Sequence, residues 1–259
     1  MQLNHHRQGS GEPLVLIHGI GSRWQIWEAP LERLVSEREV IALDLPGFGE
    51  SPMPPPGTPA GAKSLTDLVA GFLSEVGLER PHVAGNSLGG WISLELARRG
   101  LVRSATCLSP AGFHNPREAV YQRTLFRVNV RTARLMAPQA ERMLAPAWMR
   151  RAAFWQFTTH GDQIPRQSAA GHVRALAYAP WFDETLIAIN SETFSAGEQI
   201  VVPVTIAWGQ HDRVLLPRQA PRAALAVPSA RMLTLHGCGH VPTYDDPEQV
   251  ARVLLEGSA

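Results

Sequence analysis

Short unbroken runs of apolar residues recur along the chain, and the longer segments between them repeat apolar residues every three or four positions. Runs such as 13–17 and 39–43 are typical of strands that are buried on both faces of a parallel sheet. Segments 22–34 and 64–76 have the spacing of amphipathic helices, and each starts on a serine that is expected to cap it. The alternation predicts an α/β fold with a mostly parallel sheet.

The same pattern predicts the remaining elements of the main domain. The expected strands are residues 82–85, 104–109, 202–208 and 230–235, and the expected helices are residues 87–99, 218–226 and 246–255. Residues 1–12 should form an edge strand or a hairpin that leads into the sheet. Residues 52–62 hold five prolines and two glycines, so we expect an exposed loop there.

The pattern changes between residues 113 and 196, where no run has the character of a buried strand. Helix-like segments are interrupted by prolines, and six of the eight phenylalanines lie here. We therefore expect a helical cap at 113–196, inserted into an α/β core made of residues 1–112 and 197–259. The ten arginines of the cap, against six acidic residues, are expected to form a solvated face.

Composition narrows the class of protein. A length of 259 residues suits one large α/β domain, and a formal net charge of +1 gives no reason to expect a nucleic-acid partner. The N-terminus lacks the apolar segment of a secretory signal, and no run is long enough to span a membrane. The expectation is a cytoplasmic monomer or homodimer that binds a small molecule and no membrane. Lys63 is the only lysine.

The two cysteines and the histidines give no sign of a metal or redox centre. Cys107 and Cys238 lie in apolar stretches and are expected to be buried free thiols. The adjacent His5 and His6 form no ligand cluster with His18, and no phosphate-binding loop precedes a suitable lysine. Neither a metal nor an organic cofactor is expected.

One pentapeptide, Gly85-Asn86-Ser87-Leu88-Gly89, joins an expected strand to an expected helix. This G-x-S-x-G pattern in this context is typical of a nucleophile elbow, a sharp turn that exposes a reactive serine hydroxyl. The alternative interpretation is a glycine-rich turn that contains a serine by chance. The strand before it and the helix after it favour Ser87 as a nucleophile.

A serine hydroxyl becomes a good nucleophile only when a base removes its proton and a third group holds that base. Asp212 and His240 each follow an expected strand, and the carboxyl ends of the strands are where an open α/β sheet places its site. The chain order of Ser87, Asp212 and His240 is the one that this architecture uses. His240 is therefore predicted to be the general base and Asp212 the carboxylate that orients it.

Other ionisable residues are weaker candidates for these roles. Asp44 also follows a strand, but the proline and glycines after it indicate a structural turn, and Asp183 in the cap is a weaker alternative still. His211 lies beside the proposed acid in the sequence. His236 and His18 are expected to be structural, His18 as a brace for its loop.

The developing oxyanion of an acyl transfer needs backbone N–H donors. We expect one from Leu88, directly after the nucleophile, and one from Ile20 in the loop that follows the first long strand. The glycines on both sides of Ile20 suit a loop whose amides face a substrate, although they would also suit a tight turn with no catalytic role.

Taken together, these motifs resemble the α/β-hydrolase superfamily, and the resemblance extends over the whole chain. They are His-Gly-x-Gly at 18–21, Asp-x-Pro-Gly-x-Gly-x-Ser at 44–51, Gly-x-Ser-x-Gly at 85–89, Gly-x-x-Asp at 209–212 and Gly-x-Gly-His at 237–240. The resemblance implies an eight-stranded, mostly parallel sheet and a helical cap inserted after the sixth strand. The serine nucleophile differs from the aspartate of the dehalogenase and epoxide hydrolase branches.

The main hypothesis for function is a serine hydrolase, resembling carboxylesterases, that acts on a small and fairly apolar ester. The walls of its acyl pocket are expected to come from the oxyanion loop, the strand ends and the cap: Ile20, Trp24, Phe113, Trp155, Trp181, Leu215 and Val241.

The sequence leaves two alternative functions open. One is a C–C bond hydrolase of ring-fission products, a group with a similar elbow and cap. That group usually has a tryptophan after the catalytic histidine, whereas Val241 stands there in this chain. The other is a ligand-binding receptor on a hydrolase scaffold, which an intact triad does not rule out.

Overall fold

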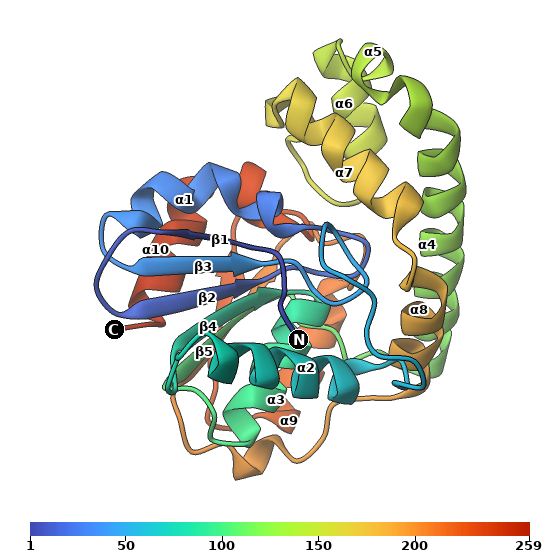
Figure 1. Ribbon diagram of the computed structural model, residues 1–259. Coiled ribbons are helices and arrows are strands. Elements are labelled where there is room, and N and C mark those ends of the chain that lie inside the picture. The colour runs from blue at the N-terminus through green and yellow to red at the C-terminus, as the bar shows by residue number, and fades with distance from the viewer.

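One sheet of seven strands runs through the molecule, and the computed structural model describes all 259 residues (Figure 1). The strands are β1 His5–Gln8, β2 Pro13–Ile17, β3 Glu39–Leu43, β4 His82–Asn86, β5 Ser104–Leu108, β6 Val204–Gly209 and β7 Arg231–Leu235. Their spatial order is β1-β3-β2-β4-β5-β6-β7. Strand β1 is antiparallel to β3 and every other pair is parallel, which confirms the predicted mostly parallel α/β sheet.

Helices cover both faces of this sheet (Figure 1). The helices are α1 Glu28–Val35, α2 Ala62–Glu75, α3 Leu88–Arg98, α4 Pro116–Met136, α5 Ala140–Met143, α6 Ala147–Phe154, α7 Arg166–Tyr178, α8 Phe182–Ser191, α9 Ala220–Ala226 and α10 Pro247–Glu256. Short 3-10 helices are η1 Trp24–Trp27, η2 Ala137–Gln139, η3 Gly161–Gln163, η4 Gly197–Gln199, η5 Pro217–Gln219 and η6 Pro242–Tyr244. Helices α1 and α10 pack together on one face, and α2 packs on α3 on the other.

Side chains of a strand alternate between these two layers. In β2, Leu14 and Leu16 belong to the apolar cluster of the α1 and α10 side, whereas Val15 and Ile17 belong to the cluster of the α2 and α3 side. Because both faces are covered, the buried residues 14–17 of β2 and 40–43 of β3 are all apolar, which is why these strands appear as unbroken apolar runs in the sequence.

The resemblance implied eight strands, and this number is wrong for this chain. Residues before β2 form one strand only, because Gly9 and Gly11 both have positive φ, of 90° and 103°, and turn the chain directly into β2. The expected edge strand is therefore present as β1, and a second strand of a hairpin is absent. For the same reason the cap follows the fifth strand of the sheet, β5, rather than the sixth.

Two helix starts also differ from the prediction. Helix α2 begins at Ala62 with Gly61 at its N-cap, so Ser64 lies inside the first turn and does not cap it. After Ser22 the chain forms η1 before α1, and neither has a side-chain cap. Helix α10 begins as expected, because the Asp246 carboxylate accepts a hydrogen bond from the Gln249 amide.

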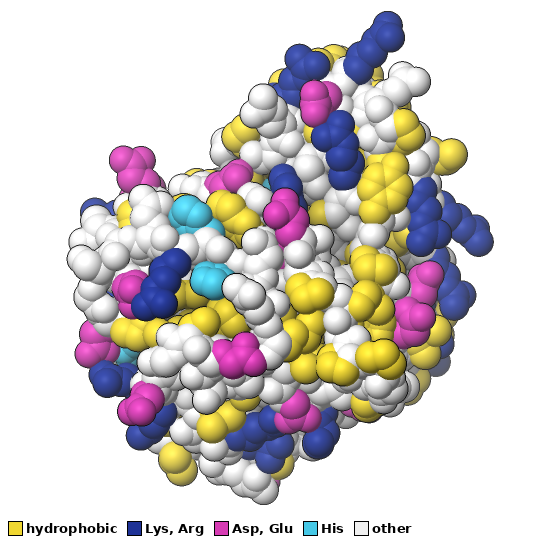
Figure 2. All heavy atoms as spheres, in the orientation of Figure 1, with side chains coloured by type: hydrophobic (Ala, Val, Ile, Leu, Met, Phe, Trp, Pro, Cys, Tyr) yellow, Lys and Arg dark blue, Asp and Glu magenta, His cyan; other side chains and the backbone are white.

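The helical segment between β5 and β6, called the cap below, contains helices α4 to α8, which stand to one side of the sheet (Figure 1). Figure 2 shows Lys and Arg side chains, in dark blue, on the outer side of this segment. Its upper part has an apolar core of its own, built largely from alanines of α4, α5 and α7. Small side chains let these helices approach closely. Tyr244 of the main domain belongs to the same cluster, so the cap core continues into the core domain.

Helix α2 carries the only lysine at its N-terminal end. The Lys63 ammonium lies 3.6 Å from the Asp67 carboxylate, and its side chain is 81% exposed. A Cβ placed on the neighbouring Gly61 would lie 3.7 Å from the Ala188 Cβ of cap helix α8. The start of α2 is therefore a seam between the core and the cap. None of the helices is both long enough and apolar enough to cross a membrane.

Candidate active site

Ser87 lies in the turn between β4 and α3, with φ of 58° and ψ of −115°. A residue other than glycine rarely adopts a positive φ, so the surrounding structure must hold this conformation. The Ser87 N–H donates to the Leu108 carbonyl over 3.0 Å, and the Ser87 carbonyl accepts from the amides of Trp91 and Ala111. This network fixes the turn predicted from the G-x-S-x-G pattern.

Two glycines permit the sharp turn. A Cβ on Gly85 would lie 2.1 Å from the Gly89 carbonyl oxygen, and a Cβ on Gly89 would lie 2.1 Å from the Ile17 carbonyl oxygen. Both contacts are with backbone atoms, which cannot move aside as a flexible side chain could. Only glycine therefore fits at these two positions.

His240 and Asp212 form a buried hydrogen-bonded pair. The His240 Nδ1 lies 2.8 Å from the Asp212 Oδ2, and each residue is 2% exposed. The other carboxylate oxygen, Oδ1, accepts from the amides of Val214 and Leu215, both over 2.8 Å. Because one oxygen of Asp212 is held by its own loop, the other is fixed in direction toward the imidazole.

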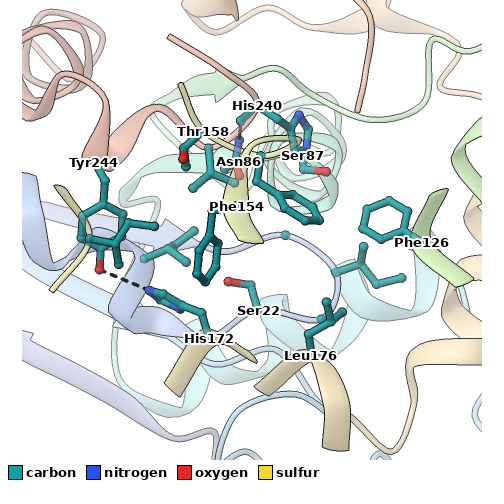
Figure 3. A pocket seen from close by; sticks show the side chains of 17 residues that line it. Ser22, Asn86, Ser87, Phe126, Phe154, Thr158, His172, Leu176, His240 and Tyr244 are labelled. Atoms are coloured by element: carbon teal, nitrogen blue, oxygen red, sulfur yellow. Dashed lines mark hydrogen bonds between the residues drawn. The ribbon is translucent and has the colours of Figure 1, made fainter. Parts of the chain in front are cut away.

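Asn86 connects this pair to the elbow. Its side-chain amide donates to the His240 carbonyl over 2.8 Å and to the Leu108 carbonyl over 3.1 Å. Ser87 and His240 line the same cavity, and Figure 3 shows their side chains at the same wall. The structure thus pairs the predicted histidine with the predicted aspartate and places the predicted serine on the same cavity wall as the histidine. The Ser87 hydroxyl forms no hydrogen bond with His240 in this structure.

Leu88 directly follows Ser87, and Ile20 lies in a loop that closely approaches Ser87. Leu88 is the first residue of α3, so its N–H has no acceptor within the helix. Ile20 lines the cavity with its loop, and no protein group accepts a hydrogen bond from its amide. A Cβ on Gly19 would lie 3.1 Å from the Ser87 Cβ, which shows how closely the loop approaches the serine.

His18 holds this loop in place. Its Nδ1 lies 2.7 Å from the Gly19 carbonyl, so Nδ1 carries the proton, and its Nε2 accepts from the Leu45 amide over 2.9 Å. Burial lowers the pKa of His18 and keeps the ring neutral. With both nitrogens bound to backbone groups, His18 is a brace between two loops, in agreement with the structural role expected for it.

The alternative acids and bases lie elsewhere. The Asp44 carboxylate accepts from the Asn4 side chain and the amides of Trp24 and Glu50, which makes it a structural element of its loop. The exposed Asp183 lies on α8 in an outer groove beside arginines of α4. His211 and His236 are exposed and do not line the cavity around Ser87.

The cavity beside Ser87 has an empty volume of about 690 Å³, part of which is open to solvent. Of the pocket residues predicted from the sequence, Ile20 and Val241 line it. Their neighbours across the cavity are three phenylalanines of the cap, namely Phe126, Phe154 and Phe157. The sequence indicated an aromatic cap, but it did not indicate which of the aromatic rings turn inward.

The other five predicted pocket residues do not line the cavity. Trp24 stacks on His6, with ring centroids 4.6 Å apart. Trp155 is 52% exposed, and the Arg213 guanidinium lies over its ring. The remaining three are buried in the main apolar core: Phe113, Trp181 and Leu215. Each was predicted from its position near a strand end or in the cap. In the structure each side chain instead packs in the core or lies at the surface.

Four polar residues that were not predicted from the sequence also line the cavity: Ser22, Thr158, His172 and Tyr244. His172 lies in the middle of α7 with no motif around it, so nothing in the sequence points to it. Tyr244 follows the predicted base by four positions, which is the only signal that could have suggested it. No group of three or more His, Cys, Asp or Glu side chains is arranged to hold a metal ion.

Comparisons with known proteins agree with this architecture. The profile described as "Alpha/beta hydrolase family" matches residues 14–253. The epoxide hydrolase EphH of Mycobacterium tuberculosis is 29% identical over 196 residues, which is 73% of this chain and 91% of that protein. The enol-lactonase from Burkholderia xenovorans LB400 superposes with a TM-score of 0.76 at 20% identity, covering 98% of this chain and 95% of the other.

A further relative has a longer chain. The dihydrolipoyllysine-residue acetyltransferase component of the acetoin cleaving system of Cupriavidus necator is 28% identical over 254 residues, or 93% of this chain. The match covers 62% of that protein. The names of these relatives span several reactions, so the similarity identifies a shared fold and a hydrolase family rather than one substrate.

Proposed function

We propose that this chain, which belongs to the alpha/beta hydrolase family, is a serine hydrolase that cleaves small and fairly apolar carboxylic esters through an acyl-enzyme intermediate. The observation that carries the proposal is the buried His240–Asp212 hydrogen bond of 2.8 Å behind the cavity wall that His240 shares with Ser87. Buried polar pairs of this kind are costly unless they are well satisfied, and a triad is the arrangement that uses one.

In the proposed mechanism the Ser87 Oγ attacks the ester carbonyl carbon while its proton passes to the His240 Nε2. The Asp212 carboxylate holds Nδ1–H and so leaves the lone pair of Nε2 available to take the serine proton. The imidazolium then gives the proton to the departing alcohol as the ester C–O bond breaks. A water molecule, deprotonated in turn by His240, hydrolyses the acyl-serine and regenerates the hydroxyl.

The tetrahedral intermediates place negative charge on the former carbonyl oxygen. The amides of Ile20 and Leu88 are the proposed donors to that oxygen, because neither is used for the regular hydrogen bonding of a strand or helix. Removing one such donor in other serine enzymes lowers the rate by about a hundredfold or more. The strained φ of Ser87 is consistent with a turn that is kept for this geometry.

The lining of the cavity supports an apolar, uncharged acyl group. Nine of its 17 lining residues are hydrophobic, and they include the three cap phenylalanines Phe126, Phe154 and Phe157. No lysine, arginine, aspartate or glutamate lines the cavity, so nothing there would pair with an ionised substrate. A charged acyl group would lose its hydration without gaining a partner.

The test is hydrolysis of a series of p-nitrophenyl acyl esters by the wild type, Ser87→Ala and His240→Ala. We expect the wild type to turn over the short acyl esters and each variant to lose at least about a thousandfold in kcat. Labelling with a fluorophosphonate probe, followed by peptide mapping, should place the adduct on Ser87 in the wild type. Thermal unfolding of each variant controls for loss of structure.

Activity that survives in both variants would show that the reaction does not use this triad. A folded wild type that neither cleaves the esters nor reacts with the probe would instead favour a ligand-binding role. Turnover of a vinylogous diketo acid with the esters ignored would favour the C–C bond hydrolase that the sequence left open.

A further inference from the structure

A polar group of residues lies at the end of the cavity that is farther from Ser87. Figure 3 shows Tyr244 and His172 on the opposite side of the cavity from Ser87, with the Ser22 hydroxyl between them and the centre. His172 comes from cap helix α7 and Tyr244 from η6 of the core domain. The cavity is therefore apolar along its walls and polar at this far end.

The hydrogen bonds of this group fix the position of a proton. The Tyr244 hydroxyl lies 3.0 Å from the Gln25 carbonyl oxygen, which can only accept. The His172 Nε2 lies 3.2 Å from the same hydroxyl. Tyrosine has one proton to donate, so both hydrogen bonds form together only if Tyr244 donates to Gln25 and the His172 Nε2 carries a proton that it donates to Tyr244.

The other ring nitrogen is then an acceptor. Burial and the nearby positive charge of Arg23 lower the pKa of His172 to about 3, so the ring is neutral and Nδ1 holds a lone pair. No protein group donates a hydrogen bond to the buried Nδ1. The Thr158 hydroxyl, which also lines the cavity, has no partner either. Of the 13 buried side-chain nitrogen and oxygen atoms without a partner, only these two belong to residues that line the cavity, where a ligand group can complete them.

We propose that His172 is a specificity-determining residue that accepts, through Nδ1, a hydrogen bond from a hydroxyl or amide N–H group on the far part of the acyl chain. This inference rests on the proposed esterase function and gives it a substrate class, neutral esters whose acyl chain ends in a hydrogen-bond donor. The Ser22 hydroxyl also lines this end of the cavity.

The same chemistry argues against an acyl chain that ends in a carboxylate. A carboxylate has only acceptor oxygens, so it cannot donate to the Nδ1 lone pair. Arg23, whose positive charge acts on His172, does not line the cavity and so does not offer a carboxylate a direct partner there. A chain that ends in a methyl group fits the apolar walls, but it leaves Nδ1 without a partner. The donor-terminated chain is the one that satisfies both parts of the cavity.

The experiment compares p-nitrophenyl esters of matched length whose acyl chains end in a hydroxyl, a methyl or a carboxylate. For the wild type we expect kcat/KM for the best hydroxyl ester to exceed that for its methyl counterpart by about three- to tenfold, mostly through KM. His172→Leu should abolish this preference, and His172→Gln, which keeps an acceptor, should retain part of it. Tyr178→Ala, on the same helix but 62% exposed and outside the lining of the cavity, is the matched control and should leave the ratio unchanged.

Tyr244→Phe tests the same contact from the core domain and does not depend on the folding of a changed cap helix. Without the Tyr244 hydroxyl, the His172 imidazole can carry its proton on Nδ1 instead of Nε2, so the preference for the hydroxyl ester should fall. Fluorophosphonate labelling of Ser87 is measured in every variant to report on the triad separately.

Three results would overturn the proposal. If Ser87 is labelled and the esters are cleaved, but the ratio is near one or unaffected by His172→Leu and Tyr244→Phe, the specificity role fails while the esterase function stands. If the carboxylate ester is preferred, the assigned proton position is wrong. If no ester is cleaved and Ser87 is unlabelled, the esterase function fails and this role fails with it.

Discussion

The two carboxylate oxygens of Asp212 accept hydrogen bonds from different parts of the structure. One accepts from the amides of Val214 and Leu215 and anchors the side chain to its own loop. The other accepts from the His240 Nδ1. The imidazole is thereby held in the tautomer that leaves Nε2 free to act as a base, which is the role that the proposed mechanism needs.

Asp212→Asn should therefore impair the reaction far more than the fold. The amide is similar in size but can present an N–H to Nδ1, which favours the wrong imidazole tautomer. We expect kcat for a p-nitrophenyl ester to fall by about 10⁴-fold. The measurement is steady-state kinetics beside thermal unfolding, and an Asn variant that keeps more than a tenth of the wild-type kcat would contradict the role of Asp212.

The sequence allowed prediction of some site residues and not of others, for a physical reason. Ser87, Asp212 and His240 each follow a strand, and parallel strands all end at one edge, so their meeting follows from the fold. His172 meets Tyr244 only because α7 packs over η6. That contact depends on where the cap helices dock, which no local pattern encodes.

At the scale of elements, Asp245 connects the cap to the loop that carries His240. Its carboxylate accepts from the amides of Thr159 and His160 in the cap and from the amide of Gly239 beside His240. In addition, the Val241 amide donates to the cap carbonyl of Phe157 over 2.8 Å. The cap and the histidine loop are therefore held as one unit.

Asp245→Ala should loosen both segments at once. It leaves three backbone amides without an acceptor, so we expect a loss of about 2–4 kcal/mol in the free energy of unfolding and a lower kcat as His240 becomes less well placed. Thermal unfolding and ester kinetics measure the two effects. Asp183→Ala, which removes an exposed carboxylate from the cap, is the control. Equal behaviour of the two variants would show that the hydrogen bonds of Asp245 matter neither for stability nor for activity.

Prediction of the helix starts succeeded at one element and failed at two. Asp246 is followed by a proline at the first helical position, and together these determine where α10 begins. Ser22 and Ser64 had no comparable partner residue. Helix α2 instead begins at Ala62, whose side chain is buried against the core, so packing rather than capping decided its start.

At the scale of the whole molecule, two neutral histidines, the buried His18 and the partly buried His172, make stability depend on pH. Burial lowers the pKa of His18, and burial with Arg23 lowers that of His172 to about 3 from an ordinary value of 6.5. Below about pH 6.5 the unfolded chain binds protons at these positions that the folded chain does not. Stability therefore falls on acidification, by up to about 1.4 kcal/mol per pH unit for each histidine.

Thermal unfolding followed from pH 7 to pH 4 measures this slope. Burial raises the pKa of Glu118, but the Asn115 amide and two arginines together lower it by more, to below its ordinary value. Protonation of Glu118 on acidification therefore also lowers the stability of the fold. The comparison that isolates one histidine is thus between the wild type and His172→Gln, which should lose stability less steeply. Parallel curves for the two proteins would contradict a neutral His172.

The architecture as a whole was predictable because five motifs and the alternating apolar runs agree on one fold. The number of strands was not predictable in the same way. Whether residues 1–12 form one strand or two depends on the turns at Gly9 and Gly11, and the edge strand contributes few buried side chains to mark it in the sequence.

The solitary Lys63 offers a practical handle. A reagent that reacts with amines can label a single side chain of this protein, that of Lys63. The other amine, at Met1, forms an ion pair with Glu75. Because Gly61, two positions earlier, lies against α8, a fluorophore attached at Lys63 would lie at the contact between the core and the cap. Its emission would report in real time on any opening between them as substrate enters.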